Sequence, residues 1–443
     1  MRRLVLYGLV VALVVPAAAW AHATLKSEFP GFQQELRVGP KFVRLHFDQI
    51  VQLPVIEVID THGLNHAGRA VVTGTDVRAR VATLPAGAYT IRWHVLSSDG
   101  HVVSGVWTFG VRVAAPPPTE AYGASGPTRT EHAVRWLYFL ALALTIGALG
   151  FRLVVLRGLA VPPALEKRLL VLAGVGVVGV LEVGIAAFLL RCEDVLQLPF
   201  GKFLYGDLSP ISGGTRYGKT FVAMTLGFAL VAAFVYLAWL LERPRLYAPA
   251  LALALVFVGG LSVSGHDAVD PGSSWKSELA DWVHLSCVSL WIGGLVALAV
   301  ALWPAAPALR REVFERFSRF ATVLVALVLA AGTYLAIVRL PALHDLWRFG
   351  YGRVLLVKLA LVALVLAWGG VHRTFVRRAL ADAGEGFVAR VGRSVAGESV
   401  VGIAVLLVAA ILVDSKPPPQ PVPSSSSNRS AYSGAVGSSS WRK

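Results

Sequence analysis

The sequence predicts two folds in one chain: an all-β antiparallel sandwich of the Greek-key or immunoglobulin type, followed by an all-α polytopic membrane domain of about eight transmembrane helices. The first prediction rests on apolar residues that alternate with polar ones in the N-terminal part of the chain. The second rests on apolar runs that reach the roughly 20 residues needed to cross a bilayer. Of the 443 residues, 56% are hydrophobic and only 15% are charged, whereas soluble domains are about 45–50% apolar.

Residues 1–21 have the features of a secretory signal peptide. Arg2 and Arg3 precede an apolar run from Leu4 to Val15, and small residues follow at 19 and 21, where a signal peptidase reads the chain. Cleavage after Ala21 would make His22 the first residue of the mature protein.

Residues 22–113 form the predicted exported β-domain. Apolar and polar residues alternate over 43–47 and 89–95, and residues 106–111 make a further strand, with turns predicted at 54, 61–63, 74 and 85–87. A period of two predicts strands with one buried face. A domain of this length can hold one hydrophobic core. Residues 114–131, which include three consecutive prolines, are predicted to form an extended linker.

Residues 132–413 form the predicted membrane domain, and an exported β-domain places the start of its first span outside. The loops then assigned to the inside carry more Arg and Lys than those assigned to the outside, as the positive-inside rule requires. An even number of spans returns the tail, residues 414–443, to the outside, and its Pro- and Ser-rich composition is typical of disorder. The eight apolar spans are expected near Trp136–Leu156, Leu169–Leu190, Thr220–Leu241, Leu246–Ser264, Trp282–Trp303, Phe320–Val338, Val354–Gly370 and Val395–Val413.

The charge and the motifs argue against nucleic-acid and nucleotide partners. The net charge is +15, but much of the basic charge lies in short loops between spans, where it sets topology. The pattern Gly-x-x-x-x-Gly-Lys-Thr occurs at Gly213–Thr220, but it leads directly into an apolar span and does not follow a buried strand, so we predict no nucleotide site. The two cysteines, Cys192 and Cys287, lie in or beside spans, so no disulfide framework is implied for the exported domain.

A free N-terminal histidine is the strongest candidate for metal chemistry. The α-amine and the Nδ1 of His22 can close a chelate ring on one metal ion, and Asp99 and His101 supply a carboxylate and a second imidazole. Three nitrogens and one anionic oxygen in a plane suit Cu(II) better than tetrahedral zinc. The mature β-domain has no methionine and no cysteine, so we expect no tight Cu(I) site there. The alternative is a chance histidine after a signal peptide, with an unrelated Asp and His in a loop.

Four other histidines of the β-domain are excluded from the predicted site. His46 and His94 fall on the polar faces of their strands and are expected to be solvated. His62 and His66 share a turn-rich loop, where metal binding would be adventitious.

The fourth and fifth spans contain a second candidate metal site. His266 follows the end of the fourth span, and Asp281, His284 and Cys287 are spaced three apart at the start of the fifth, so they share one helical face. An ionisable residue in a span is a functional candidate by default. We predict a metal site of His266 and His284 near the outer surface, with Asp281 and Cys287 as further candidates. The alternative is a pair of packing or interfacial histidines.

The β-domain contains three motifs: His22-Ala23-x-Leu25, Ser27-x-x-Pro30 and Trp93-x-Val95-x-Ser97-x-Asp99-Gly100-His101-x-Val103-Ser104-Gly105. With these motifs it resembles the CopC family of exported copper-binding domains. The resemblance implies a Cu(II) site made of His22, Asp99 and His101. Some members add a methionine-rich Cu(I) site, which this sequence lacks.

The membrane part contains a second set of motifs: Ser264-Gly265-His266, Asp281-x-x-His284, Trp291-x-Gly293-Gly294-Leu295, Tyr351-Gly352 with Lys358, and Glu398. With these motifs it resembles the CopD family of copper-linked membrane proteins. One departure is His372-Arg373, where the family favours Asn-Arg. The two parts together resemble a CopC–CopD fusion, which implies a role in copper uptake or tolerance and copper as the metal of the membrane site.

Three further charges lie within spans. By the predicted topology, Glu182 and Lys358 lie toward the outer side and Glu398 toward the inner side. Either these groups pair structurally, or Glu182 and Glu398 mark a cation path.

The predicted function is copper binding and transport across the cytoplasmic membrane, with the β-domain outside capturing Cu(II) and passing it to the membrane domain. The expected partners are copper ions and the lipid bilayer, with any copper chaperone unidentified. The direction of transport and the oxidation state of copper in the membrane are left open. We do not expect an enzyme, because Asp99 would occupy the position that oxygen needs at a histidine brace. A further alternative is a haem-binding electron carrier with His266 and His284 as axial ligands.

Overall fold

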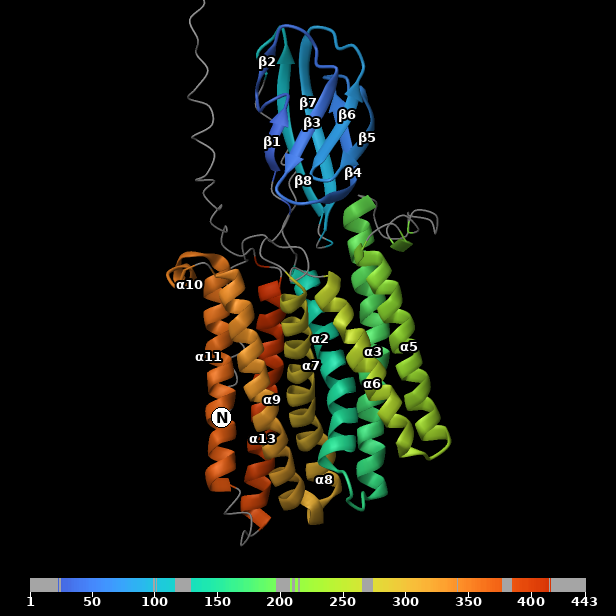
Figure 1. The fold of residues 1–443 in the computed structure, drawn as a ribbon, viewed down its shortest axis with the longest axis vertical. Coiled ribbons are helices and arrows are strands. Elements are labelled where there is room, and N and C mark those ends of the chain that lie inside the picture. The colour runs from blue at the N-terminus through green and yellow to red at the C-terminus, as the bar shows by residue number, and fades with distance from the viewer. Residues whose placement is uncertain are drawn as a thin grey trace, which may run out of the picture.

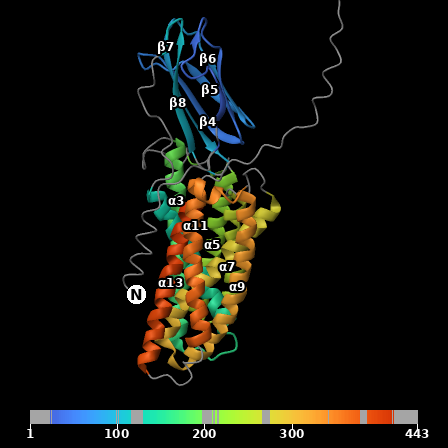
Figure 2. The same ribbon diagram turned by 90° about the vertical axis from the view of Figure 1, so that its left-hand side faces the viewer.

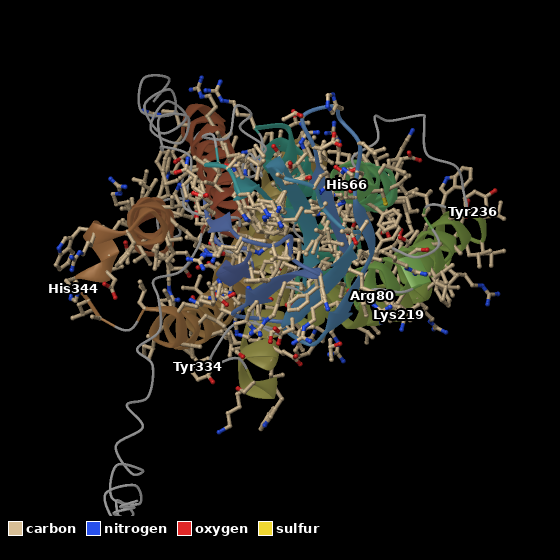
Figure 3. The ribbon with its side chains drawn as sticks, turned by 90° about the horizontal axis from the view of Figure 1, so that it is seen from above. His66, Arg80, Lys219, Tyr236, Tyr334 and His344 are labelled. Carbon is tan, nitrogen blue, oxygen red and sulfur yellow. The ribbon has the colours of Figure 1, made fainter. Side chains whose placement is uncertain are left out.

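The computed structural model describes residues 23, 25–98, 100, 102–115, 129–196, 208, 212–213, 216–264, 274–340, 342–376, 385–413 and 415. A β-domain stands on one end of a bundle of long helices (Figure 1). We call this end of the bundle the upper end and the opposite end the lower end. Seen from above, the β-domain lies over the middle of the bundle, while Tyr236 and His344 project on opposite sides (Figure 3).

The β-domain is a sandwich of two four-stranded sheets, with strand orders β1-β3-β6-β5 and β2-β8-β7-β4. The chain alternates between the sheets from β1 to β5, whereas β5–β6 and β7–β8 are hairpins within one sheet. The described pairs of strands are antiparallel except β2 and β8, which are parallel. The predicted sandwich is confirmed, with that one parallel pair as a departure. The turn predicted at Pro54 is wrong, because Pro54 lies within β4, where the register shifts between Gln52 and Val55. The strands are β1 (Leu25–Phe29), β2 (Glu35–Leu36), β3 (Phe42–Phe47), β4 (Val51–Ile59), β5 (Ala67–Thr73), β6 (Asp76–Val81), β7 (Gly87–Ser97) and β8 (Val102–Val111).

The core of the sandwich comes from the alternation in β3 and β7. Leu45 and Phe47 on β3 face inward with at most 1% of their surface exposed, and Ile91 and Trp93 on β7 meet them. The rings of Phe47 and Trp93 pack edge to face, with their centroids 5.3 Å apart. These apolar faces hold the two sheets together.

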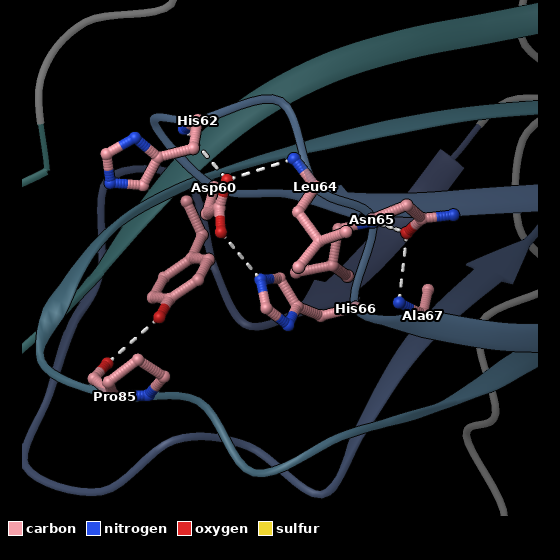
Figure 4. A network of polar contacts seen from close by, with 9 residues as sticks. Asp60, His62, Leu64, Asn65, His66, Ala67 and Pro85 are labelled. Carbon is pink, nitrogen blue, oxygen red and sulfur yellow. Dashed lines mark hydrogen bonds and ion pairs between the residues drawn. The ribbon is translucent and has the colours of Figure 1, made fainter.

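The loop between β4 and β5 is organised by the carboxylate of Asp60 (Figure 4). Its Oδ1 accepts hydrogen bonds from the backbone N–H groups of His62 and Leu64 at 2.8 and 3.0 Å. Its Oδ2 lies 2.9 Å from Nε2 of His66. The imidazole of His66 therefore has a carboxylate partner within its own loop.

This network makes the stability of the β-domain sensitive to acid. The hydrogen bond from His66, followed by the bond from Leu64, lowers the pKa of Asp60 from 3.8 to about 2. A carboxyl group with a lowered pKa stabilises the fold above its unfolded pKa, and this contribution is lost as the pH falls from about 4 to about 2. We expect Asp60→Asn to be destabilising at pH 6 and much less so at pH 2.

Hydrogen exchange of β-domain peptides, compared between variant and wild type at each pH, measures this difference. Glu35→Gln changes an exposed carboxylate on β2 and serves as the control. An equal effect of Asp60→Asn at pH 6 and pH 2 would contradict the assignment.

Eight helices among the described residues are long and apolar enough to cross a membrane, which confirms the predicted number. α7 begins at Trp275 and not at Trp282, and α9 begins at Arg310 and not at Phe320, because polar turns extend these helices beyond their apolar segments. The helices are α2 (Arg129–Gly150, continued by η1, Phe151–Val155), α3 (Pro163–Leu196), α5 (Arg216–Leu240), α6 (Tyr247–Ser264), α7 (Trp275–Val296, continued by η4, Ala297–Leu302), α9 (Arg310–Arg339), α11 (Gly350–Val371, continued by η6, His372–Val376) and α13 (Glu385–Val413).

The centre of the bundle is formed by α2, α7 and α13. More than half of the most apolar segment of each of these helices is buried inside the protein. The Gly293-Gly294 pair predicted from the motif lies where α7 meets α2. A Cβ atom on Gly293 would lie 1.8 Å from the carbonyl oxygen of Ala143. The two backbones are therefore in direct contact, as small residues allow between membrane helices.

Candidate functional site

The end of the β-domain nearest the helices carries the turn between β7 and β8. Gly100 lies in this turn with a φ of +84°, a conformation that favours glycine, and its N–H donates to the carbonyl oxygen of Ser97 at 2.9 Å. The predicted ligands His22, Asp99 and His101 lie outside the described residues.

The chain next to His22 is tied to the strand that precedes this turn. The N–H of Ala23, which is only 2% exposed, donates to Oγ of Ser97 at 3.3 Å. Ser97 is the last residue of β7. This bond joins residues 74 positions apart, so the neighbour of His22 contacts the strand end from which the Asp99-to-His101 segment continues.

The same turn rests on the upper ends of α3 and α5 (Figure 1). Leu96 is buried in a cluster with Phe188 and Cys192, against which Tyr217 also packs. A Cβ atom on Gly100 would lie only 3.0 Å from Cγ of Tyr217. The turn between the two predicted ligands therefore contacts the ring of Tyr217 directly.

This contact corrects the prediction for His94, which is 8% exposed and not solvated. His94 lies on the same face of β7 as Leu96, and α3 covers Leu96 at that end of the strand. Strand parity assigns a side chain to a face, but it does not say whether water or another domain covers that face. His46, by contrast, is partly exposed: 39% of its side chain is accessible, and its Nδ1 lies 3.4 Å from Oδ1 of Asp76.

A cavity of about 310 Å³ lies in the upper half of the bundle and is lined by residues from all eight spanning helices. Tyr217, which contacts the turn of the β-domain, is one of them. The lining is mostly apolar, as ligand cavities usually are. It also includes the charged or titratable side chains of Asp281, His284, Arg339 and Lys358.

His284 is held in one orientation at this cavity. Its Nδ1 lies 3.2 Å from the carbonyl oxygen of Val328 on α9, and an N–H at that position donates to the carbonyl. The absence of a side chain at Gly332 leaves room for the ring, since a Cβ there would lie 3.1 Å from Cε1 of His284. This arrangement leaves Nε2 as the nitrogen that carries the free lone pair.

Asp281 links α7 to α6. Its Oδ2 accepts a hydrogen bond from Oγ of Ser262 at 2.7 Å, and Nε1 of Trp282 donates to the carbonyl oxygen of Leu255 at 2.7 Å. The fourth and fifth spans are therefore neighbours, as predicted, although His266 lies outside the described residues.

The structure brings Asp281 and His284 to the cavity but does not bring Cys287 there. Cys287 packs in the core of the bundle with Trp291 and is not among the residues that line the cavity. Within the described part of the chain, no three His, Cys, Asp or Glu side chains are close enough to hold a metal ion.

The three further charges within the predicted spans lie in different surroundings. Glu182 is exposed on the surface of the bundle, Lys358 lines the cavity, and Glu398 is buried with its Oε2 2.7 Å from Nδ1 of His372. In the sequence, His372 stood out only as a departure from a family pattern, and its pairing with Glu398 was not predicted. The pairing could have been predicted from position, because His372 follows the seventh span and the antiparallel eighth span begins close by.

The fold and the site define a multi-pass membrane protein with a β-sandwich at the upper end of its helical bundle (Figure 2). The bundle contains the cavity described above. Three families match consecutive parts of the chain: the CopC domain at residues 25–112, the copper resistance protein D-like N-terminal domain at 130–276, and copper resistance protein D at 311–412. The chain belongs to the copper resistance protein family, as a fusion of a CopC domain with a CopD-type membrane domain.

Individual relatives support both parts of the fusion. The copper transport protein CutJ of Bacillus subtilis (strain 168) is 26% identical over 439 residues, which cover 94% of this chain and 78% of that protein. Copper resistance protein C of Pseudomonas syringae pv. tomato is 32% identical and matches 23% of this chain and 88% of its own. Copper resistance protein D of the same organism is 33% identical and matches 38% of this chain and 57% of its own.

Proposed function

We propose that this protein captures Cu(II) outside the cytoplasmic membrane with its β-domain and delivers copper to the cavity of the membrane domain for uptake. The observation that carries the proposal is the position of Tyr217, which contacts the turn at Gly100 and also lines the cavity. A metal ion released from this turn would reach the cavity without leaving the protein.

The proposed capture site consists of the α-amine and imidazole of His22 with Asp99 and His101. The hydrogen bond between Ala23 and Ser97 supports it, because it ties the chain on either side of these ligands together. The absence of methionine and cysteine from the mature β-domain favours Cu(II), which takes imidazole, amine and carboxylate ligands.

The proposed receiving site in the membrane is built on His284. The bond from Nδ1 to a backbone carbonyl is the support that metal-binding imidazoles commonly have. His266 would supply a second imidazole, since it follows Ser264, the last residue of α6, and α6 packs beside α7. Asp281 would act as a charge partner near the cavity mouth. We assign no ligand role to Cys287, because it does not line the cavity.

The proposed topology places the β-domain and the C-terminal tail on the periplasmic or extracellular side. The signal-peptide features of residues 1–21 and the basic residues that follow α2 and α5 at the lower end support this orientation. Because the capture domain lies outside, we propose uptake as the direction of transport.

Cellular copper tests the function and its direction. A deletion strain is expected to contain less copper than the wild type when copper is scarce, and a complementing plasmid should restore the level. A higher copper content in the deletion strain would instead indicate export, and an unchanged content would contradict a transport function.

If copper is delivered past Tyr217, a change of this residue should impair copper transport without impairing Cu(II) binding. Tyr217→Ala is expected to lower copper transport roughly tenfold, a change equivalent to about 1.4 kcal/mol, while Cu(II) binding by the β-domain stays unchanged. The control is Tyr236→Ala, which changes an exposed tyrosine on the same helix. Uptake of radioactive copper into cells with equal protein levels measures both variants. Normal uptake by Tyr217→Ala would contradict direct delivery.

A further inference from the structure

A buried polar cluster lies in the lower half of the bundle, between α11 and α13. Nδ1 of His372 lies 2.7 Å from Oε2 of Glu398, and its Nε2 lies 2.8 Å from Oγ of Ser394. Nε1 of Trp368 donates to the same hydroxyl at 2.9 Å. The side chains of His372 and Glu398 are 5% and 6% exposed, so both titratable groups are held away from water and from the upper cavity, which neither of them lines.

The hydrogen bonds of this cluster fit two protonation states of the imidazole. When His372 is neutral, Nδ1–H donates to Glu398 and the hydroxyl of Ser394 can donate to Nε2. When His372 is protonated, Nε2–H can donate to the same hydroxyl oxygen, because Trp368 occupies only one of its two lone pairs. His372 can therefore gain or lose a proton without leaving a buried polar atom unpaired, which a purely structural ion pair does not require.

The protonation state also changes the charge inside the membrane. A neutral imidazole beside a carboxylate carries a net charge of about −1, whereas adding one proton gives a neutral pair. A net charge at this depth is unfavourable unless it is balanced. A copper cation that passes through the bundle can balance it, so copper and the proton favour opposite states of the pair.

His372 and Glu398 are surrounded by an aromatic ring and by charged groups that have other partners or are exposed. Phe314 of α9 packs edge-on to the imidazole, with ring centroids 6.0 Å apart. The charged residues of α9, η6 and α13 near the pair bind elsewhere or are exposed: Arg310 donates to the carbonyl of Trp303, Arg316 to Glu312 and Arg373 to Oγ1 of Thr322, Arg311 lies beside Glu315, Arg390 lies over the ring of Phe387, and Arg319 and Arg393 are exposed.

The local backbone supports a functional role. His372 is the first residue of the π-helical segment η6, which continues α11. Single π-helical turns within α-helices are uncommon and occur frequently at functional sites. The segment begins at the residue whose two ring nitrogens contact α13.

We propose that His372 and Glu398 form a proton-binding site that is emptied when copper passes and refilled afterwards, so that copper uptake is coupled to proton movement in the opposite direction. The coupling rests on the proposed transport function, whereas proton binding by the pair does not. The balance is simple: one proton adds to the imidazole–carboxylate pair to give imidazolium–carboxylate or imidazole–carboxylic acid, and the same proton leaves.

Infrared difference spectroscopy of the purified full-length protein without copper tests proton binding. We expect a pH-dependent signal of the Glu398 carboxyl group or the His372 ring that Glu398→Gln and His372→Asn remove. Ser399→Ala should retain it, because this neighbour of Glu398 bonds only to the backbone of its own helix at Val395. Ser394→Ala keeps both members of the pair and should shift the pH at which the signal changes. No pH-dependent signal from either group would overturn the proposal.

Proteoliposomes that contain a pH-sensitive dye test the coupling. In the wild type and in Ser399→Ala, copper uptake should be accompanied by a rise of the internal pH, and Glu398→Gln should reduce this proton movement at least tenfold. Copper uptake without proton movement in the wild type would overturn the coupling and leave the transport function intact. If copper does not move at all, the transport function fails, and the infrared titration still decides whether the pair binds a proton.

Discussion

A protein with one glycine inserted between Ala21 and His22 is expected to bind Cu(II) more than a hundredfold more weakly than the wild type. The insertion moves the α-amine away from the imidazole of His22, so the chelate ring that both groups form on one metal ion is lost. Removal of a residue that only hydrogen-bonds to a metal ligand already reduces metal affinity roughly 10–100-fold. Loss of a direct ligand should reduce the affinity further.

Competition with a Cu(II) chelator measures the affinity, after mass spectrometry has shown which residue begins each mature protein. Electron paramagnetic resonance should show fewer nitrogen ligands in the extended protein. His46→Asn serves as the control, because it removes an exposed imidazole of the same domain that contacts Asp76. Equal Cu(II) affinity of the extended and wild-type proteins would exclude the N-terminal chelate.

Replacement of His284 by alanine is expected to reduce copper transport at least tenfold while the protein level stays close to that of the wild type. The variant removes the nitrogen that faces the metal in our proposal, whereas the fold loses only one hydrogen bond to Val328, worth about 1 kcal/mol. Copper-dependent growth and copper accumulation, normalised to the amount of protein in the membrane, provide the measurement.

Cys287→Ser is the matched control, because Cys287 lies one helical turn further along α7 and does not line the cavity. A double His266 and His284 variant with normal copper transport would place the membrane site elsewhere. Loss of the protein itself would support a packing role for the two histidines. The purified protein is also expected to show no Soret band, and such a band would favour the haem-binding alternative.

Local patterns in the sequence were enough to predict the two folds. Alternation over 43–47 and 89–95 depends on a side-chain period of two, which any strand with one buried face must have. Apolar runs depend on the thickness of the bilayer, so eight spans could be predicted without knowing how they pack. Helix ends at Trp275 and Arg310 were missed because polar turns beyond the bilayer carry no hydropathy pattern.

The spacing of residues along one helix also predicted part of the membrane site. Asp281 and His284 share a face because they are three residues apart on one helix, and both line the cavity in the structure. The same rule placed Cys287 with them, but a helix turns by about 100° per residue, so successive steps of three drift around its axis. By the second step the side chain has left the cavity for the core of the bundle.

Residue type and local spacing were enough to predict the sandwich, the number of spans and the identity of the candidate copper ligands. Contacts between distant segments could not be predicted in this way. Leu96 near the end of β7 packs against α3, His94 on the same face is buried, Gly100 lies on Tyr217, and His372 bonds to Glu398. Periodicity describes one element at a time, whereas these contacts arise from how separate elements pack.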